Sequence, residues 1–303
     1  MTSLQNVHSR KRHNQTPENE RILICTDLDR TLLPNGKQPE NPPARHLFRR
    51  LAARPEIATA YVTGRHRQLV LEAIDEYALP LPGYVIGDVG TSIYSIVKKQ
   101  WRLWECWQNE IGISWQGLTH DALVAMFTDL ASLHLQEAEK QNTYKLSYYV
   151  DPAVDVSQLL SVMQQRLDQK QIAATLVWSI DETTNTGLLD ILPASATKRH
   201  AIEFLMAEEG YTLENTVFAG DSGNDLPVLT SPIHSVLVAN ATNEVRQQAL
   251  QMAIAQGTQD ALYLAHGTLL DMNGNYSAGI LEGCVHYLPH TRDWIEEDGQ
   301  NGN

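Results

Sequence analysis

The chain has 303 residues, 43% of them apolar, and its 23 basic and 36 acidic residues give a formal net charge of −13. This length is enough for about two domains with buried cores. No apolar run approaches the roughly 18 residues of a membrane span, so we expect no membrane partner. The negative charge also argues against nucleic acid, which binds clustered positive charge.

The cysteines and the amino-terminal segment indicate in which cellular compartment the protein is expected. The three cysteines, Cys25, Cys106 and Cys284, lie far apart and form no CxxC pair, so neither a disulfide framework nor a zinc site is expected. Residues 1–20 carry a basic group without a following apolar stretch, which predicts a disordered arm rather than a secretory signal. A cytoplasmic protein fits both observations.

Short apolar runs alternate with helical patterns in the first third of the chain. Strands are predicted at 22–26, 57–62 and 84–86, and helices at 44–53 and 67–77. Residues 87–107, rich in Tyr and Trp, predict a hairpin. This alternation of strand and helix is typical of a parallel sheet with right-handed crossovers.

The middle of the chain follows a different pattern. Residues 118–139 predict a helix, and 144–150 alternate with period two, as a half-exposed antiparallel strand does. The other predicted elements are a helix at 156–167, strands at 174–180 and 188–192, and a polar turn at 181–187. We therefore predict an inserted α+β cap at 111–192, of the kind that forms lids over sites.

The last third returns to the alternation of strand and helix. Helices are predicted at 198–209, after Asp225 and at 244–254, and strands at 216–219 and 235–239. The predicted fold class is α/β: a Rossmann-like parallel-sheet core, residues 21–110 and 193–303, with the inserted α+β cap.

Four separate elements with polar residues lie beside predicted strands at their carboxyl ends. Residues 27–31, 63–65 and 220–225 follow predicted strands, and Lys198 opens a predicted helix. Each alone has an ordinary explanation, as a helix cap or a solvated charge. Together they are expected to meet at the carboxyl edge of the sheet, where ligands bind in open α/β folds. Several carboxylates there would repel one another without a divalent cation, and oxygen ligands favour Mg²⁺.

Magnesium at such an edge indicates phosphate chemistry. A lysine and a threonine beside the ion supply the charge and hydrogen bonds that a transferring phosphoryl group requires. Asp27 can then attack phosphorus, while Asp29, two residues on, reaches the leaving oxygen as an acid and later activates water.

The order of these motifs resembles the haloacid dehalogenase (HAD) superfamily, whose phosphatases carry DxDxT, Thr/Ser, Lys and GDxxND in turn. The corresponding residues here are Asp27–Thr31, Thr63, Lys198 and Gly220–Asp225. The cap between the second and third motifs is similar to type IIB members. Passages at 144–148, 189–193, 240–241 and 277–283 resemble sucrose-phosphate phosphatases in particular.

The resemblance implies catalytic roles. Asp27 would be the nucleophile that forms an aspartyl-phosphate, and Asp29 the general acid and base. Thr63 and Lys198 would hold the transferring phosphoryl group.

A metal site and a sugar site are implied in the same way. Asp27, the backbone carbonyl of Asp29, and Asp221 would ligate Mg²⁺, with Asn224 and Asp225 orienting that shell. Asp225 also counts among the metal-site residues, and Asn224 among those at the substrate.

Sugar contacts are implied for Arg65 of the Thr-Gly-Arg motif and for Lys145 and Ser147 of the cap. Two departures from the family pattern stand out. The polar turn at 181–187 is longer than in sucrose-phosphate enzymes, which leaves the fit of the sugar open. Arg30 also follows Asp29 where many relatives have Asn or Gly.

The leading hypothesis is a Mg²⁺-dependent phosphatase for a small sugar phosphate, with sucrose 6-phosphate first. Phosphates of mannosylglycerate, mannosylfructose or glucosylglycerol are alternative substrates, and a phosphomutase is a further option on this core. A non-catalytic phosphatase-like module is another class, although such modules are expected to lose motif carboxylates that this chain keeps. We expect a monomer, with a sucrose-phosphate synthase as a candidate partner.

Overall fold

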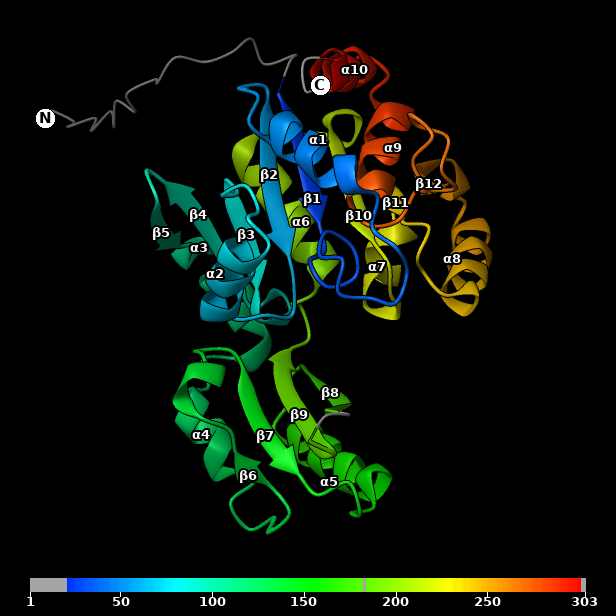
Figure 1. The fold of residues 1–303 in the computed structure, drawn as a ribbon. Helices are drawn as coiled ribbons and strands as arrows, with labels where there is room; N and C mark the ends of the chain where they lie inside the picture. Colours follow the sequence, from blue (N-terminus) through cyan, green and yellow to red (C-terminus); the bar gives the residue numbers. More distant parts are fainter. Residues whose placement is uncertain (1–20, 182–183, 301–303) are drawn as a thin grey trace, which may run out of the picture.

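A sheet of eight strands forms the centre of the larger part of the molecule (Figure 1). The computed structural model describes residues 21–181 and 184–300, with side chains to residue 296, so the predicted arm at 1–20 lies outside the described residues. In spatial order the strands are β12 (Leu262–Leu264), β11 (His234–Leu237), β10 (Thr216–Gly220), β1 (Ile22–Thr26), β2 (Ile57–Val62), β3 (Tyr84–Gly87), β4 (Ser92–Val97) and β5 (Gln100–Leu103). The first six are parallel, and β4 and β5 add an antiparallel hairpin at one edge.

Strand β1 lies at the centre because both of its faces are apolar. All five of its residues are buried. Ile22 and Ile24 face one hydrophobic cluster, and Leu23 and Cys25 face another on the opposite side of the sheet. A strand that buries both faces favours the interior of a parallel sheet.

Helices cover both faces of this sheet. One face carries α1 (Pro42–Ala52), α2 (Arg67–Glu76), α9 (Ser277–Tyr287) and α10 (Thr291–Gln300). The other carries α3 (Glu105–Gly112), α6 (Lys198–Glu209), α7 (Leu226–Leu229) and α8 (Asn243–Gln256). This arrangement confirms the predicted α/β core. Among the described residues, no helix combines the length and the apolar character needed to cross a membrane.

A second, antiparallel sheet lies beyond the carboxyl ends of the core strands (Figure 1). Its strands, in spatial order, are β6 (His134–Leu135), β7 (Leu146–Val150), β9 (Thr186–Pro193) and β8 (Ala174–Asp181). With α4 (His120–Ala125) and α5 (Val156–Gln169) it has a hydrophobic cluster of its own. Trp107 and Ile111 still pack with the core, whereas Trp115 packs in the second cluster. We propose 111–192 as the limits of this cap.

The predicted helix at 118–139 is wrong over most of its length. Thr119 caps α4, which already ends at Ala125. Beyond it, Arg166 of α5 donates to the carbonyl of Met126, at 2.7 Å, and to the Asp129 carboxylate. The chain then pairs with β7 as β6. Tertiary contacts therefore override a local pattern that favoured a longer helix.

The polar turn predicted at 181–187 is also shorter than expected. Asp181 pairs with Thr186, and Ile180 with Gly187, so both ends of the predicted turn belong to the β8–β9 ladder. Only residues 182–185 connect the strands, and 182–183 lie outside the described residues. Polar residues on an exposed pair of strands resemble a loop in sequence.

A buried carboxylate fixes the α9 end of the core. Glu282 is 3% exposed and accepts hydrogen bonds from the hydroxyls of Tyr263 and Thr268 and from the backbone of His266 and Gly267. Burial acts to raise the pKa of Glu282, but these donors outweigh it and hold the pKa below its ordinary value of 4.5. The ionised group therefore stabilises the fold.

Glu282→Gln should lower the free energy of unfolding by about 1–3 kcal/mol at pH 7, because it weakens these charge-assisted hydrogen bonds. Because the pKa of Glu282 is lower in the folded state than in the unfolded state, its ionisation stabilises the fold above pH 4.5. This stabilisation is lost as the pH falls through the pKa of the folded state. The difference between variant and wild type should therefore shrink below about pH 4 in denaturant titrations. Glu244→Gln, at an exposed position, serves as control. A difference that persists at low pH would contradict the assignment.

Candidate active site

The carboxyl ends of the core strands enclose a cavity of about 320 Å³. It is lined by Asp27, Asp29, Arg30, Thr63, Gly64, Arg65, Leu69, Lys198, Asp221, Ser222 and Asn224. These residues come from segments up to 197 positions apart, the difference between 224 and 27. The structure thus brings together the polar residues that follow the predicted strands, with Asp225 buried directly behind them.

Asp27 sits where β1 ends and is buried. Its backbone N–H donates to the carbonyl of Ala219 at 2.9 Å, which extends the pairing of β1 with β10. One carboxylate oxygen accepts the backbone N–H of Leu28 at 2.8 Å. The chain therefore fixes both the position and the orientation of this side chain.

Lys198 links two of the buried carboxylates. Thr197 caps α6, and the helix begins with Lys198, whose buried side chain enters the cavity. Its Nζ lies 3.2 Å from Asp27 Oδ1 and 2.8 Å from Asp225 Oδ1. Burial acts to lower the pKa of Lys198, but the two carboxylates outweigh it and raise the pKa, so the lysine is charged.

The loop after β10 supplies Asp221 and Asp225. Asp225 is fully buried, and its Oδ2 accepts the backbone N–H groups of Asp221 and Ser222 and the Ser222 hydroxyl, each at 3.1 Å. A side chain at Gly220 would place Cβ 2.6 Å from Asp225 Cγ. Only glycine allows the backbone to lie this close to the carboxylate.

Asp27, Asp221 and Asp225 form a cluster that could hold a metal ion. One oxygen from each lies within 4.8 Å of the others. Burial is the largest cause that raises the pKa of Asp27 to about 7 and of Asp221 to about 6, and the neighbouring carboxylates add to it. A cation would relieve this cost, and a donor set of oxygens suits a hard ion such as Mg²⁺.

Asp29 is held by Arg65. The Arg65 guanidinium donates to both carboxylate oxygens, at 2.9 and 2.7 Å, and Asn35 donates to Oδ1 at 2.7 Å. Burial acts to raise the pKa of Asp29, but these partners outweigh it and lower the pKa. Arg65, predicted to contact the sugar, thus contacts Asp29 in this structure. Thr63 lines the cavity, and its hydroxyl accepts the backbone N–H of Arg65.

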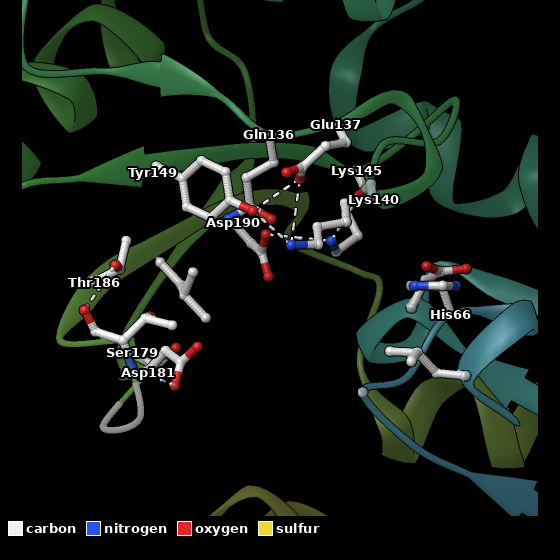
Figure 2. Close-up of a pocket in the computed structure, with 15 residues that line it drawn as sticks. His66, Gln136, Glu137, Lys140, Lys145, Tyr149, Ser179, Asp181, Thr186 and Asp190 are labelled. Atoms are coloured by element: carbon white, nitrogen blue, oxygen red, sulfur yellow. Dashed lines mark hydrogen bonds and ion pairs between the residues drawn. The ribbon is translucent and has the colours of Figure 1, made fainter. Parts of the chain in front are cut away.

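A larger cavity of about 600 Å³ lies between the core and the cap (Figure 2). Its wall shares Gly64 and Leu69 with the smaller cavity, so the two adjoin. The polar residues around it are His66, Asp88, Gln136, Glu137, Lys140, Lys145, Tyr149, Ser179, Asp181, Thr184, Thr186 and Asp190. Donors and acceptors of both charges suit a neutral polyhydroxy ligand.

The predicted cap residues Lys145 and Ser147 lie at different depths. Lys145 lines the cavity, and its Nζ donates to Ser147 Oγ at 2.6 Å and lies 3.3 Å from Asp190 Oδ1. Ser147 is fully buried behind it, and its hydroxyl donates to Asp190. In this structure Ser147 supports the cavity wall without facing the cavity. Asn224 lies on the wall of the smaller cavity.

Several wall residues were not predicted from the sequence. Asp88 follows β3 as the other carboxylates follow their strands, so the same signal could have identified it. Asp190 is a charged residue within an apolar strand, which is a second such signal. Gln136, Glu137 and Tyr149 gave no signal, because pairing between β6 and β7 brings their segments together.

The capped α/β core, with an Asp-x-Asp strand end, a buried lysine and an acidic loop on one cavity, defines a phosphatase of the HAD type. The family model described as sucrose-6F-phosphate phosphohydrolase matches residues 20–288. The chain belongs to this family.

Relatives of this chain carry several activities in their names. A HAD-like hydrolase of Nitrosococcus oceani is 53% identical, over 91% of this chain and 74% of the relative. Sucrose-phosphatase 1 of Nicotiana tabacum is 29% identical, over 88% and 59%. Mannosylfructose-phosphate phosphatase of Agrobacterium fabrum is 27% identical, over 88% and 96%. This chain thus spans well under two thirds of the tobacco enzyme.

A solved structure supports the fold. The sucrose-phosphatase of Synechocystis sp., in complex with sucrose and phosphate, is 23% identical with a TM-score of 0.64, over 88% of this chain and 98% of that one. At this identity the likeness concerns the fold alone.

Gly220→Ala should lower the free energy of unfolding by about 1–3 kcal/mol, because the added methyl group overlaps Asp225. Urea denaturation at pH 7 measures the change. Gly223→Ala is a matched control in the same loop, since nothing lies within 4 Å of its added Cβ. Equal stability of the two variants would contradict the role assigned to Gly220.

Proposed function

We propose that this protein is a Mg²⁺-dependent phosphatase that hydrolyses a sugar phosphate monoester, with sucrose 6-phosphate as the first candidate substrate. The observation that carries the proposal is the adjacency of two cavities. The smaller one lies at the ion pairs of Lys198 with Asp27 and Asp225 and is lined by Asp221. The larger one is lined by donors and acceptors that suit a neutral polyhydroxy ligand. A sugar phosphate would place its phosphate in the smaller cavity and its sugar in the larger one.

Asp27 is the proposed nucleophile. Its carboxylate oxygen attacks phosphorus, an aspartyl-phosphate forms, and the bond between phosphorus and the sugar oxygen breaks. Lys198, beside Asp27, neutralises charge on the phosphoryl oxygens, and Thr63 donates a hydrogen bond from the cavity wall. Because the buried lysine is fixed by Asp225 as well, it needs no rearrangement to act.

Asp29 is the proposed general acid and base. As a carboxylic acid it gives its proton to the departing sugar oxygen, and as a carboxylate it takes a proton from the water that attacks the aspartyl-phosphate. Release of inorganic phosphate then restores Asp27. In the structure Arg65 holds both Asp29 oxygens, so substrate groups that draw Arg65 away would free Asp29 for this role.

Asp27, Asp221 and Asp225, with the backbone carbonyl of Asp29, are the proposed residues that hold Mg²⁺. When bound, the ion supplies positive charge for the phosphoryl oxygens. Asp225 is the most deeply buried of the three, and its hydrogen bonds to the loop fix the position of Asp221.

Lys145 and Asp190 are proposed to bind hydroxyls of the sugar in the larger cavity, with Ser147 orienting both side chains. Asn224 and Arg65 would contact the substrate nearer the phosphate. The mannosylfructose-phosphate phosphatase among the relatives makes phosphates of other glycosyl compounds the second candidates. A cytoplasmic monomer that works with a sucrose-phosphate synthase stays a prediction.

Asp27→Asn should abolish phosphate release, with a loss of at least about 1,000-fold in kcat, because an amide is not a nucleophile for phosphorus. Phosphate release from sucrose 6-phosphate with Mg²⁺ measures it. Unfolding curves of the variant check that the fold is kept, and the exposed Asp260→Asn is the control. Near-normal turnover by Asp27→Asn would overturn the mechanism.

Substrate choice is tested with Lys145→Met. We expect kcat/KM for sucrose 6-phosphate to fall at least about tenfold, because the sugar loses a charged donor, while p-nitrophenyl phosphate, which has no sugar, is hydrolysed as before. Lys170→Met, an exposed lysine of the cap, is the control. The wild type is also compared on mannosylfructose, mannosylglycerate and glucosylglycerol phosphates. A higher kcat/KM for one of these would replace sucrose 6-phosphate as the substrate.

A further inference from the structure

Arg30 lines the smaller cavity, of about 320 Å³, and the proposed mechanism does not use it. Its Nε lies 3.3 Å from Asp221 Oδ2. The arginine side chain is 53% exposed, whereas that of Asp221 is 4% exposed. A half-exposed cation therefore faces a buried carboxylate that is a proposed metal ligand.

The backbone of Arg30 is strained. Its φ of 57° lies in the left-handed region, which glycine or asparagine adopts at lower cost than arginine. The conformation is imposed from both sides, because the Arg30 N–H donates to Asn35 Oδ1 at 2.8 Å and the Arg30 carbonyl accepts Asn240 Nδ2 at 2.6 Å. An arginine at such a position carries a conformational cost, and these hydrogen bonds hold the backbone there in spite of it.

Each carboxylate of the acidic cluster, Asp27, Asp221 and Asp225, has a cation beside it. Lys198 lies close to Asp27 and Asp225. Asp221 has a different set of partners: Oδ1 accepts the Thr31 hydroxyl at 3.0 Å, and Oδ2 faces Arg30. Two cations thus face three carboxylates, and Arg30 is the one beside Asp221.

We propose that Arg30 is a built-in counter-ion of the metal site. It holds Asp221 in place in the absence of Mg²⁺, and it competes with Mg²⁺ for the Asp221 carboxylate. The inference rests on the proposed function, since it takes Mg²⁺ as the ion. Lys198 is buried and fixed, whereas the exposed Arg30 side chain is free to move toward solvent as the ion enters. Arg30 therefore weakens Mg²⁺ binding, and it stabilises the folded protein when the acidic cluster holds no metal ion.

The physical reason is repulsion between like charges. A divalent ion and a guanidinium beside the same carboxylate repel each other even at the dielectric constant of water, so Mg²⁺ must either overcome this repulsion or displace Arg30 from Asp221. Removal of the guanidinium should therefore tighten Mg²⁺ binding at least about threefold. A residue with only a structural role would not change this affinity in that direction.

The test is calorimetric titration of the full chain, stripped with EDTA, with MgCl₂ in the absence of substrate. Arg30→Asn removes the charge and suits the left-handed backbone, and Arg30→Lys keeps a positive charge at the same strained position. Arg292→Asn is the matched control, because Arg292 is 50% exposed and pairs with a carboxylate, Glu296, away from the cavity. Unfolding temperatures with EDTA and with Mg²⁺ give a second readout.

We expect a Kd for Mg²⁺ at least about threefold lower in Arg30→Asn, and values near wild type in Arg30→Lys and Arg292→Asn. The rise in unfolding temperature on adding Mg²⁺ should be largest in Arg30→Asn. Equal or weaker Mg²⁺ binding by Arg30→Asn would overturn the inference while the proposed function stands. Absence of Mg²⁺ binding to the wild type would overturn the proposed metal site and the inference with it.

Discussion

The ion pairs of buried Lys198 determine the geometry of the smaller cavity. One cation joins the end of β1, through Asp27, to the loop after β10, through Asp225. Taking three charged groups out of water costs several kcal/mol per ion, so stability alone is a weak reason to keep them. The arrangement is better explained by the proposed function, because it would hold the proposed nucleophile and the proposed phosphate-binding lysine in position before a substrate arrives.

Much of this arrangement is predictable from the sequence, because parallel strands impose it. Buried strands appear as apolar runs, and the residues that follow Thr26, Val62 and Gly220 must reach one edge of the sheet. The cap is less predictable. Its wall depends on pairing between segments whose polar residues alternate weakly, and β6 has only two residues, His134 and Leu135. Such a strand is defined by its partner and not by its own pattern.

The sequence also does not reveal how deeply each polar side chain of the cap is buried. Lys145 and Ser147 are two residues apart and therefore point to the same face of their strand segment. Ser147 is nevertheless covered, because its register partner Asp190 and the Lys145 side chain lie over it. Strand periodicity identifies the face, whereas the length of neighbouring side chains determines which residue reaches the cavity.

The net charge of −13 and a phosphate substrate are compatible because charge is distributed unevenly. On the wall of the smaller cavity, Arg30, Arg65 and Lys198 lie beside Asp27, Asp29 and Asp221, so cations and carboxylates are equal in number on that wall. Arg65 and Arg30 are partly exposed, whereas Lys198 is fixed. In the proposed mechanism an entering phosphate would draw Arg65 from Asp29, and a cation at the acidic cluster would compete with Arg30 for Asp221, so each carboxylate would be released for its proposed role.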